Sequence, residues 1–267
     1  MSTLSETEFK ALNRLLCDVA GFQLGPAKKL LVAGQLAPRL QAHRLARYGD
    51  YLELIAHDAA ERQLALDLVT ATDTPFFSES RHFAFLTEQV APRLRDEGAV
   101  RVWSAACASG EEPYTIAMVL LASLGHDRFE IIASDINTQA LATAREARYG
   151  MDAARDIPWA FRSSYCVKGE GPHAGSFLMD RPVREHVRFE HINLHAPLPD
   201  VGLFDVIFLR NVISAFPLDT RRSLVERVLA CLKPDGWLII GESENLHGLP
   251  LPIKMTRPSI YQHAGAR

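Results

Sequence analysis

Short apolar runs alternate with helical patterns from about Val100 onward, and this alternation restricts the fold more than any other feature of the sequence. The strand-like runs are Val100 to Ala105, Phe129 to Ser134, Phe204 to Leu209 and Trp237 to Gly241. The helical patterns between them cover Pro113 to Leu124, Asn137 to Ala147 and Thr220 to Leu232. Strands that are joined through helices pair in parallel, so the sequence predicts an α/β fold, a doubly wound sheet with helices on both faces.

The first part of the chain, about 70 residues, shows helical patterns and no strand pattern. Ser5 and Glu8 have the spacing of a capping box, and Gly21 stands where the helix after them should stop. Further helices are predicted over Pro26 to His43, over Gly49 to His57, and from a second box-like start at Asp58 and Glu61 through Leu68. We therefore expect an N-terminal all-helical domain over residues 1–75 and an α/β domain over residues 76–267.

A Gly-rich segment interrupts the alternation between the second and third strand-like runs. Its pieces read KGEGPHAGSFLM and then RPVREHVRFE, which are short and strand-like. We interpret this segment, about residues 163–188, as a small β-subdomain inserted into the α/β domain.

The charge balance and the cysteines exclude several classes of protein. The chain has 267 residues, with 29 Lys and Arg against 32 Asp and Glu, a formal net charge of −3. Non-specific nucleic-acid binding needs a dense cationic surface, so no nucleic-acid partner is expected. The four cysteines, Cys17, Cys107, Cys166 and Cys231, form no C-x-x-C pair. We expect no disulfide framework and no metal site, as suits a reducing compartment.

The sequence shows no targeting or membrane segment. It starts with MSTLSETEFK, which is polar and acidic and does not resemble a secretory signal. Its longest uninterrupted apolar stretch, Ile116 to Ala122, is far shorter than the ~20 residues that a membrane helix needs. We expect a cytoplasmic protein without membrane insertion.

The stretch from Arg101 to Leu121, RVWSAACASGEEPYTIAMVLL, is the most informative for function. A predicted strand enters a loop of small residues, and small residues let a ligand approach the backbone closely. Such loops at the carboxyl ends of strands are where open α/β sheets bind ligands. Glu111 and Glu112 would repel a pyrophosphate but suit a ligand with positive charge and hydroxyl donors, such as S-adenosylmethionine. The alternative is two surface glutamates that are favoured by the helix dipole.

Asp135 ends the second strand-like run, 25 residues after Gly110. Nucleoside-binding α/β folds place an acidic residue near this point, where it accepts hydrogen bonds from the ribose hydroxyls. The alternative is that Asp135 only caps the helix that follows.

Five segments together resemble one known family: RVWSAACASGEEPYTIAM, IIASDINTQALATAREARYG, FEHINL, FDVIFLRNV and LKPDGWLIIGESENL. In that order, they are similar to the CheR-type chemotaxis protein-glutamate O-methyltransferases, and the similarity extends over nearly the whole chain. The resemblance implies a Rossmann-like class I methyltransferase fold. It also implies S-adenosylmethionine as cofactor, S-adenosylhomocysteine as product, and methyl esterification of chemoreceptor glutamates in chemotaxis signalling.

The resemblance also implies a set of cofactor-binding residues. They are Thr72, Thr74, Ser78, Ala105, Gly110, Glu111, Glu112, Asp135, Asn193, Leu194, Arg210 and Asn211. Asn193 and Leu194 would flank the adenine, while Arg210 and Asn211 would line the site. Turn capping is the alternative role for the two asparagines.

The predicted β-subdomain matches the family as well. Family members that dock on a short peptide at the receptor's C-terminus carry a loop like Gly169, Gly171, Pro172, His173 and Gly175 here. An exposed edge strand can recruit a peptide by extending the sheet. An inert hairpin is the alternative.

The sequence departs from the family pattern at several functional positions. Ser78 stands where the family has an arginine that is thought to hold a carboxylate of cofactor or substrate, and Thr72 replaces an asparagine. Ala215 replaces a tyrosine near the transferred methyl group, and Glu242 replaces a histidine. Around Arg39, the family's receptor-facing arginines are replaced by Gln35, Pro38 and Gln41.

These departures leave the catalytic residues open. Arg81, one helical turn beyond Ser78, could supply the missing guanidinium, or could be a solvated surface residue. Three functions therefore remain: a chemoreceptor methyltransferase, a relative that binds the cofactor without catalysis and acts through protein contacts, and a methyltransferase with another acceptor. Cys107, inside the cofactor loop, is expected to be a small buried filler.

Overall fold

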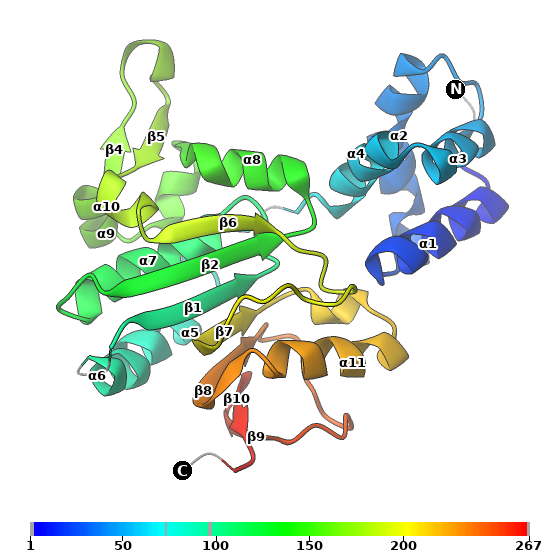
Figure 1. The fold of residues 1–267 in the computed structure, drawn as a ribbon. Helices are drawn as coiled ribbons and strands as arrows, with labels where there is room; N and C mark the ends of the chain where they lie inside the picture. The colour runs from blue at the N-terminus through cyan, green and yellow to red at the C-terminus, as the bar shows by residue number, and fades with distance from the viewer. Residues whose placement is uncertain (1–2, 73, 96–97, 266–267) are drawn as a thin grey trace.

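The computed structural model describes residues 3–72, 74–95 and 98–265. Within these residues a helical part and a sheet with flanking helices lie side by side (Figure 1). The arrowheads of β1, β2 and β6 point toward the helical part, so the carboxyl ends of these strands face it.

The helical part has the predicted start and stop signals. It consists of α1 (Glu6–Ala20), the short 3-10 turn η1 (Pro26–Lys28), α2 (Lys29–Ala42), α3 (Tyr48–His57) and α4 (Ala59–Thr70). The capping box at Ser5 is confirmed, because Ser5 accepts from the Glu8 amide at 3.2 Å while Glu8 accepts from the Ser5 amide at 2.9 Å. Gly21 ends α1 in the left-handed region, with φ 76°.

The second predicted capping box is only half formed. Asp58 does cap α4, accepting from the amides of Ala60 and Glu61. The Glu61 side chain turns inward instead and accepts from Arg39 Nε and from the Tyr51 hydroxyl, both at 2.8 Å. Glu61 is therefore a buried anchor that joins α2, α3 and α4.

The sheet confirms the predicted α/β fold and adds an antiparallel edge. The strand order is β6-β2-β1-β7-β8-β10-β9. The first five strands pair in parallel, and the last two are antiparallel. The strands are β1 (Val100–Ala105), β2 (Phe129–Asp135), β6 (Val187–His191), β7 (Phe204–Leu209), β8 (Leu232–Ile240), β9 (Ile253–Arg257) and β10 (Ile260–His263).

Helices cover the sheet on both faces, as the alternation predicts. Alternate residues of one strand enter different hydrophobic clusters: Trp103 packs in the cluster of α11 and the helical part, whereas Val102 packs in the cluster of α5 and α7. The helices are α5 (Ser80–Phe85), the π-helical turn η2 (Leu86–Val90), α6 (Ala91–Leu94), α7 (Glu111–Ser123), α8 (Thr138–Glu146) and α11 (Leu218–Leu229). A short 3-10 turn, η5 (Ile213–Ala215), follows β7.

The last predicted helix and strand are shifted. The helix predicted to run to Leu232 ends at Leu229, and β8 begins at Leu232 rather than at Trp237. Leu232 pairs with Phe204, and the register then shifts before Val206 pairs with Trp237. The strand thus continues through Pro234 and Gly236, which a sequence pattern assigns to a turn.

A small antiparallel sheet lies beyond α8, with strand order β3-β5-β4. Its strands are β3 (Arg148–Gly150), β4 (Cys166–Lys168) and β5 (Ser176–Met179). The segments η3 (Ala153–Asp156), α9 (Trp159–Tyr165), η4 (Gly171–His173) and α10 (Arg181–Arg184) accompany them. The sheet thus includes β3, which precedes the predicted insertion at 163–188, whereas Val187 and Arg188 belong to β6 of the large sheet.

Candidate functional site

A cavity of about 430 Å³ lies where the carboxyl ends of β1, β2 and β7 meet the helical part. Of the predicted site residues, those that line it are Thr72, Thr74, Asp135, Asn193, Leu194, Arg210, Asn211 and Ala215. Those that lie outside its lining are Ser78, Ala105, Gly110, Glu111, Glu112 and Arg81. Asp73, which stands between the predicted site residues Thr72 and Thr74, falls outside the described residues.

The loop after β1 brings its backbone to the cavity. Ala106 and Ala108 adopt left-handed conformations, with φ 67° and 46°, and Gly110 has φ 97°. A Cβ atom at Gly110 would stand 2.9 Å from Ala144 Cβ. Glycine is therefore required at position 110 by this tight turn, and Ala106 and Ala108 line the cavity.

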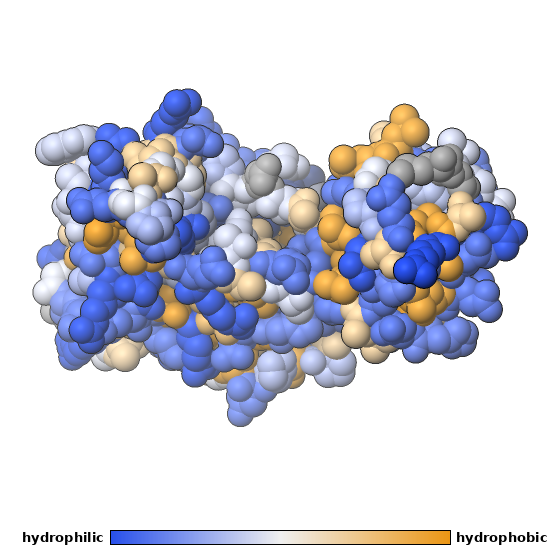
Figure 2. Space-filling view, turned by 90° about the horizontal axis from the view of Figure 1, so that it is seen from above, coloured by the Kyte–Doolittle hydropathy of each residue, from blue (hydrophilic) through white to orange (hydrophobic). Residues whose placement is uncertain are grey.

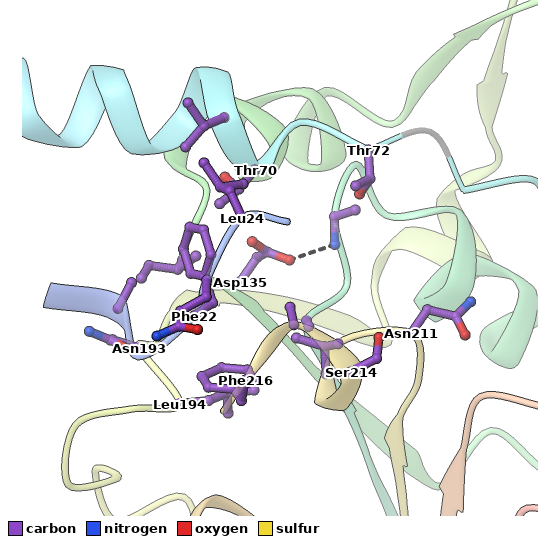
Figure 3. A pocket seen from close by; sticks show the side chains of 18 of the residues that line it. Phe22, Leu24, Thr70, Thr72, Asp135, Asn193, Leu194, Asn211, Ser214 and Phe216 are labelled. Atoms are coloured by element: carbon purple, nitrogen blue, oxygen red, sulfur yellow. Dashed lines mark hydrogen bonds between the residues drawn. The ribbon is translucent and has the colours of Figure 1, made fainter. Parts of the chain in front are cut away.

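Asp135 points toward the middle of the cavity, between Phe22 and Leu24 on one side and Thr72 on the other (Figure 3). Its two carboxylate oxygens accept from the amides of Ala108 and Asn137, each at 2.8 Å. Burial raises the pKa of Asp135, although these amide hydrogen bonds oppose the rise. The cap of α8 is Asn137, which accepts from the Ala140 amide. Asp135 is therefore not the helix cap, and its oxygens retain lone pairs for a ligand.

Glu111 and Glu112 are buried rather than on the surface, so the surface alternative is wrong. Glu112 accepts from the Ser104 hydroxyl at 2.6 Å and from Arg210 Nη1 at 2.8 Å. Glu111 accepts from the Ser109 hydroxyl. Both side chains bond to this chain's own residues behind the loop, and their contact with the cofactor stays a prediction.

Arg210 is held by two carboxylates below the cavity. Its guanidinium lies 3.1 Å from Glu79 Oε2 and 2.8 Å from Glu112 Oε2, and it donates to the Ser78 carbonyl at 2.7 Å. The side chain of Arg210 is 3% exposed. Burial alone would raise the pKa of Glu79, but the charge of Arg210 and the amide of Glu242 outweigh it and hold this pKa below its ordinary value.

His82 is packed against this Arg210 cluster. Burial, with the nearby charge of Arg210, lowers the pKa of His82 to about 4, so the ring is neutral at pH 7. Neither His82 nor the pairing of Arg210 with Glu79 and Glu112 was predicted from the sequence. One signal in the sequence could have indicated them: Glu79 matches the family's pattern at its position, as do Thr74, Phe76 and Phe77.

The helical part supplies one wall of the cavity, which no pattern in the sequence predicts. Phe22, Leu24 and Lys28 line it, from the segment between α1 and α2. Two hydrogen bonds fix this wall: the Gln23 amide donates to the Ala215 carbonyl at 2.9 Å, and Asn193 Nδ2 donates to the Val19 carbonyl at 2.7 Å. Asn193 thus fastens the wall as well as lining the cavity.

The chemistry of the lining suits an adenosyl sulfonium. Phe22, Ile192 and Leu194 offer apolar surface at the end of the cavity where Asn193 lies, which suits a flat base. Asp135 provides acceptors for hydroxyl groups, and its carboxylate favours a positive charge over a phosphate. The residues present therefore fit S-adenosylmethionine.

Other kinds of site find no support in the described residues. Within the described ranges, no group of three or more His, Cys, Asp and Glu side chains could hold a metal ion. None of the described helices is long and apolar enough to cross a membrane. Cys107, within the loop after β1, is buried, and burial raises the pKa of its thiol.

Comparison with known families and proteins gives matches over nearly the whole chain. Residues 7–70 match "CheR methyltransferase, all-alpha domain" and residues 72–261 match "CheR methyltransferase, SAM binding domain". Chemotaxis protein methyltransferase 2 of Pseudomonas aeruginosa is 33% identical over 260 residues, which cover 96% of this chain and 93% of the relative. The chemotaxis protein methyltransferase of Salmonella typhimurium is 35% identical over 263 residues, covering 97% and 90%.

Among solved structures, the glycopeptide N-methyltransferase MtfA complexed with S-adenosylmethionine is 18% identical, with a TM-score of 0.39, over 71% of this chain and 67% of that one. The two family matches and the two relatives decide the assignment. The chain belongs to the CheR methyltransferase family.

Proposed function

We propose that this protein transfers a methyl group from S-adenosylmethionine to glutamate side chains in the cytoplasmic domain of chemoreceptors, acting in the cytoplasm. The products are γ-methyl esters and S-adenosylhomocysteine. The observation that carries the proposal is Asp135 in a cavity at the carboxyl ends of β1, β2 and β7, within a chain of the CheR methyltransferase family.

We assign the cofactor's adenosyl group to the middle of the cavity and to the end near Asn193. Asp135 accepts from the ribose hydroxyls, and Phe22 and Leu194 pack against the base. The other end, with Thr72, Thr74 and Asn211, then receives the methionine portion and the acceptor.

The bound cofactor supplies an electrophilic methyl group on a positively charged sulfur. The acceptor glutamate is already ionised at neutral pH, with an ordinary pKa of about 4.3, so the protein needs no general base. The work of the residues is to hold the acceptor oxygen in line with the methyl group and to exclude its water. Ser78 and Ala215 provide neither the charge nor the ring that the family pattern has at their positions.

Arg81 receives no part in this proposal. It is exposed and is not among the residues that line the cavity. Arg210 is the guanidinium at the cavity, and it is already bound to two carboxylates and a carbonyl.

We further propose that β4 binds a short C-terminal peptide of the receptor. This strand forms one edge of the small sheet, and Val167 within it is 49% exposed. The loop beyond it is tight, because a Cβ atom at Gly169 would stand 2.1 Å from the His173 carbonyl oxygen. Tyr165 and Gly169 form backbone hydrogen bonds on the β5 side, so by the alternation along a strand the Lys168 amide points to the free edge. Lys168→Pro, which lacks this amide, should weaken peptide binding as measured by calorimetry. Unchanged affinity would remove the peptide from the proposal.

The test of the methyl transfer uses receptor-containing membranes and cofactor with a radiolabelled methyl group. Base-labile label on receptor glutamates is the expected result. Tight binding of S-adenosylhomocysteine without any methyl transfer would refute the proposal. It would indicate instead a protein that binds the cofactor without catalysis and acts through protein contacts. Label on another molecule would identify a different acceptor.

A further inference from the structure

The segment between α1 and η1, residues 22–25, lines the cavity but belongs to no helix or strand. Phe22 and Leu24 within it are buried, and Figure 3 shows both side chains beside Asp135. The backbone of a helix or a strand is fixed by its own ladder of hydrogen bonds, and this segment lacks such a ladder. Other groups must therefore hold it at the cavity.

Asn13 of α1 holds this segment at Leu24. Its Oδ1 accepts from the Leu24 amide at 2.7 Å, and its Nδ2 donates to the Leu24 carbonyl at 3.1 Å. One carboxamide thus satisfies both polar backbone groups of a single residue, and both bonds are partly buried. Because hydrogen bonds weaken steeply when they are bent, the pair fixes the orientation of the Leu24 backbone as well as its distance from α1.

The same segment is also tied to the α/β domain. The Gln23 amide donates to the Ala215 carbonyl of η5 at 2.9 Å. Gln23 and Ala215 both line the cavity, so this bond lies at its edge. The segment is therefore held from two sides, and Asn13 is the anchor that comes from the helical part.

Apolar packing alone would not fix the position of this wall. Figure 2 shows hydrophobic side chains gathered on the helical part, while the rest of that face is mostly hydrophilic. Phe22 and Leu24 belong to the hydrophobic cluster that continues from the helical part to α11. Hydrophobic attraction has no direction, so it keeps these side chains out of water without setting their exact position. The two hydrogen bonds from Asn13 supply the direction.

We propose that Asn13 is a positioning residue for the cofactor. It holds Leu24, and with it Phe22, at the depth where the adenine base packs against the wall. Asn13 is not among the residues that line the cavity, so it acts through the Leu24 backbone and not by contact with the ligand. The inference rests on the proposed placement of the base at this end of the cavity, and it adds a residue of α1 to the cofactor site.

Removal of the Asn13 side chain should weaken cofactor binding through the wall. In Asn13→Ala the Leu24 amide and carbonyl lose these partners, so molecules with a displaced wall become populated. The apparent dissociation constant then rises by the inverse of the fraction in which the wall is in place. A hydrogen bond corresponds to a factor of about 2 to 12 in an equilibrium, and we expect a rise of about three- to tenfold.

The effect should be confined to the cofactor. The base and the transferred methyl group are assigned to different ends of the cavity, so a displaced wall leaves the reacting atoms of a bound cofactor where they were. We therefore expect a raised KM for S-adenosylmethionine, with unchanged kcat and unchanged KM for a chemoreceptor cytoplasmic fragment.

The experiment compares Asn13→Ala and Asn13→Asp with the control Glu8→Ala. Asn13→Asp turns a carboxylate oxygen, in place of a donor, toward the Leu24 carbonyl. Glu8 is on the same helix and also bonds to two backbone amides, those of Ser5 and Gly49, but it does not line the cavity. Dissociation constants of S-adenosylhomocysteine and of adenosine are measured by calorimetry, and urea unfolding of the same samples shows that each variant is folded.

Both Asn13 variants should raise the two dissociation constants by the same factor, because both ligands contain the base. Glu8→Ala should lower the free energy of unfolding and keep the affinity of the wild type. Wild-type affinity in the folded Asn13 variants would overturn the inference, and so would an equal loss of affinity in Glu8→Ala. A loss for S-adenosylhomocysteine but not for adenosine would also overturn it, since the effect would then act on the methionine portion.

Failure of the proposed function would look different. A wild-type protein that binds neither ligand would refute the placement of the cofactor, and the role of Asn13 with it. A wild-type protein that binds both ligands but transfers no methyl group would refute the methyl transfer, and the dissociation constants of the variants would still decide the role of Asn13.

Discussion

Replacing Asp135 with asparagine tests the cofactor site at its central residue. The substitution keeps the size of the side chain and exchanges one acceptor oxygen for an NH2 group that can only donate. Each oxygen of Asp135 now accepts from a backbone amide, Ala108 on one side and Asn137 on the other, both at 2.8 Å. An asparagine can satisfy one of these amides and turns a donor toward the other.

The structure separates the effect on stability from the effect on binding. An unsatisfied buried amide costs about 1–3 kcal/mol. Burial raises the pKa of Asp135, which means that the carboxylate itself is disfavoured in the folded state, and its removal offsets part of that cost. Cofactor binding has no such offset, because the ribose hydroxyls lose a charged acceptor worth about 1.5–3 kcal/mol. We therefore expect the dissociation constant of S-adenosylhomocysteine to rise about 10- to 150-fold, with a smaller loss of stability.

The assay is calorimetric titration with S-adenosylhomocysteine, together with urea unfolding of the same samples. Asp67→Asn is a matched control, because Asp67 is also buried and also accepts from a backbone amide, that of Thr138 at 2.8 Å, but does not line the cavity. It should lose stability and keep its affinity. If Asp135→Asn binds as tightly as the wild type, or if both variants lose affinity equally, Asp135 does not hold the ribose.

Three further predictions concern pH and stability. Cofactor affinity should fall as the pH drops through the raised pKa of Asp135, since the protonated group loses acceptor capacity, and Asp135→Asn should abolish this dependence in calorimetry at several pH values. The hydrogen bond from Arg39 lowers the pKa of Glu61 to about 2, against about 4.3 when unfolded, so Glu61→Gln should lower the free energy of unfolding by about 3 kcal/mol at pH 7. That stabilisation is present above the unfolded pKa and is lost as the pH falls from about 5 toward 2; a gap between variant and wild type that stays constant in urea unfolding over this range would contradict it. Gly21→Ala should lower Tm more than Gly125→Ala, because both glycines have φ 76° but only at Gly21 would a Cβ atom stand 2.4 Å from His195 Nδ1, and equal shifts in calorimetric scans would rule out the clash.

The elements that could be predicted best are those whose residues are buried on both faces. β1 and β7 have the predicted bounds, because most residues of Val100–Ala105 and Phe204–Leu209 are apolar, and nearly all of them are buried. β8 was predicted too short, since its pairing with β7 carries Pro234 and Gly236 through the strand. β3 was missed, because three residues that pair only with the distant Ser176–Met179 leave no local pattern.

The parts of the candidate site that could be predicted are those in which a single segment of the sequence contains the functional residue and also shows where in the fold it lies. Asp135 could be placed because it is the last residue of a strand. The loop before Gly110 could be placed because its small residues indicate a tight turn, which the left-handed backbone there confirms. The wall formed by Phe22, Leu24 and Lys28 was not predictable, because it depends on how the helical part docks. That docking rests on contacts far apart in sequence, such as the Gln23 amide to the Ala215 carbonyl.

The ion pairs of Arg210 show why the charge of a side chain does not by itself indicate that the side chain binds a ligand. A guanidinium and two glutamates near a strand end would each suggest contact with the ligand, and the sequence offers no way to tell which of them pair with one another. The fold pairs Arg210 with Glu79 and Glu112, so one positive charge is outweighed by two negative ones before any ligand enters. With Asp135 added, the buried charges beside the cavity favour a cationic ligand.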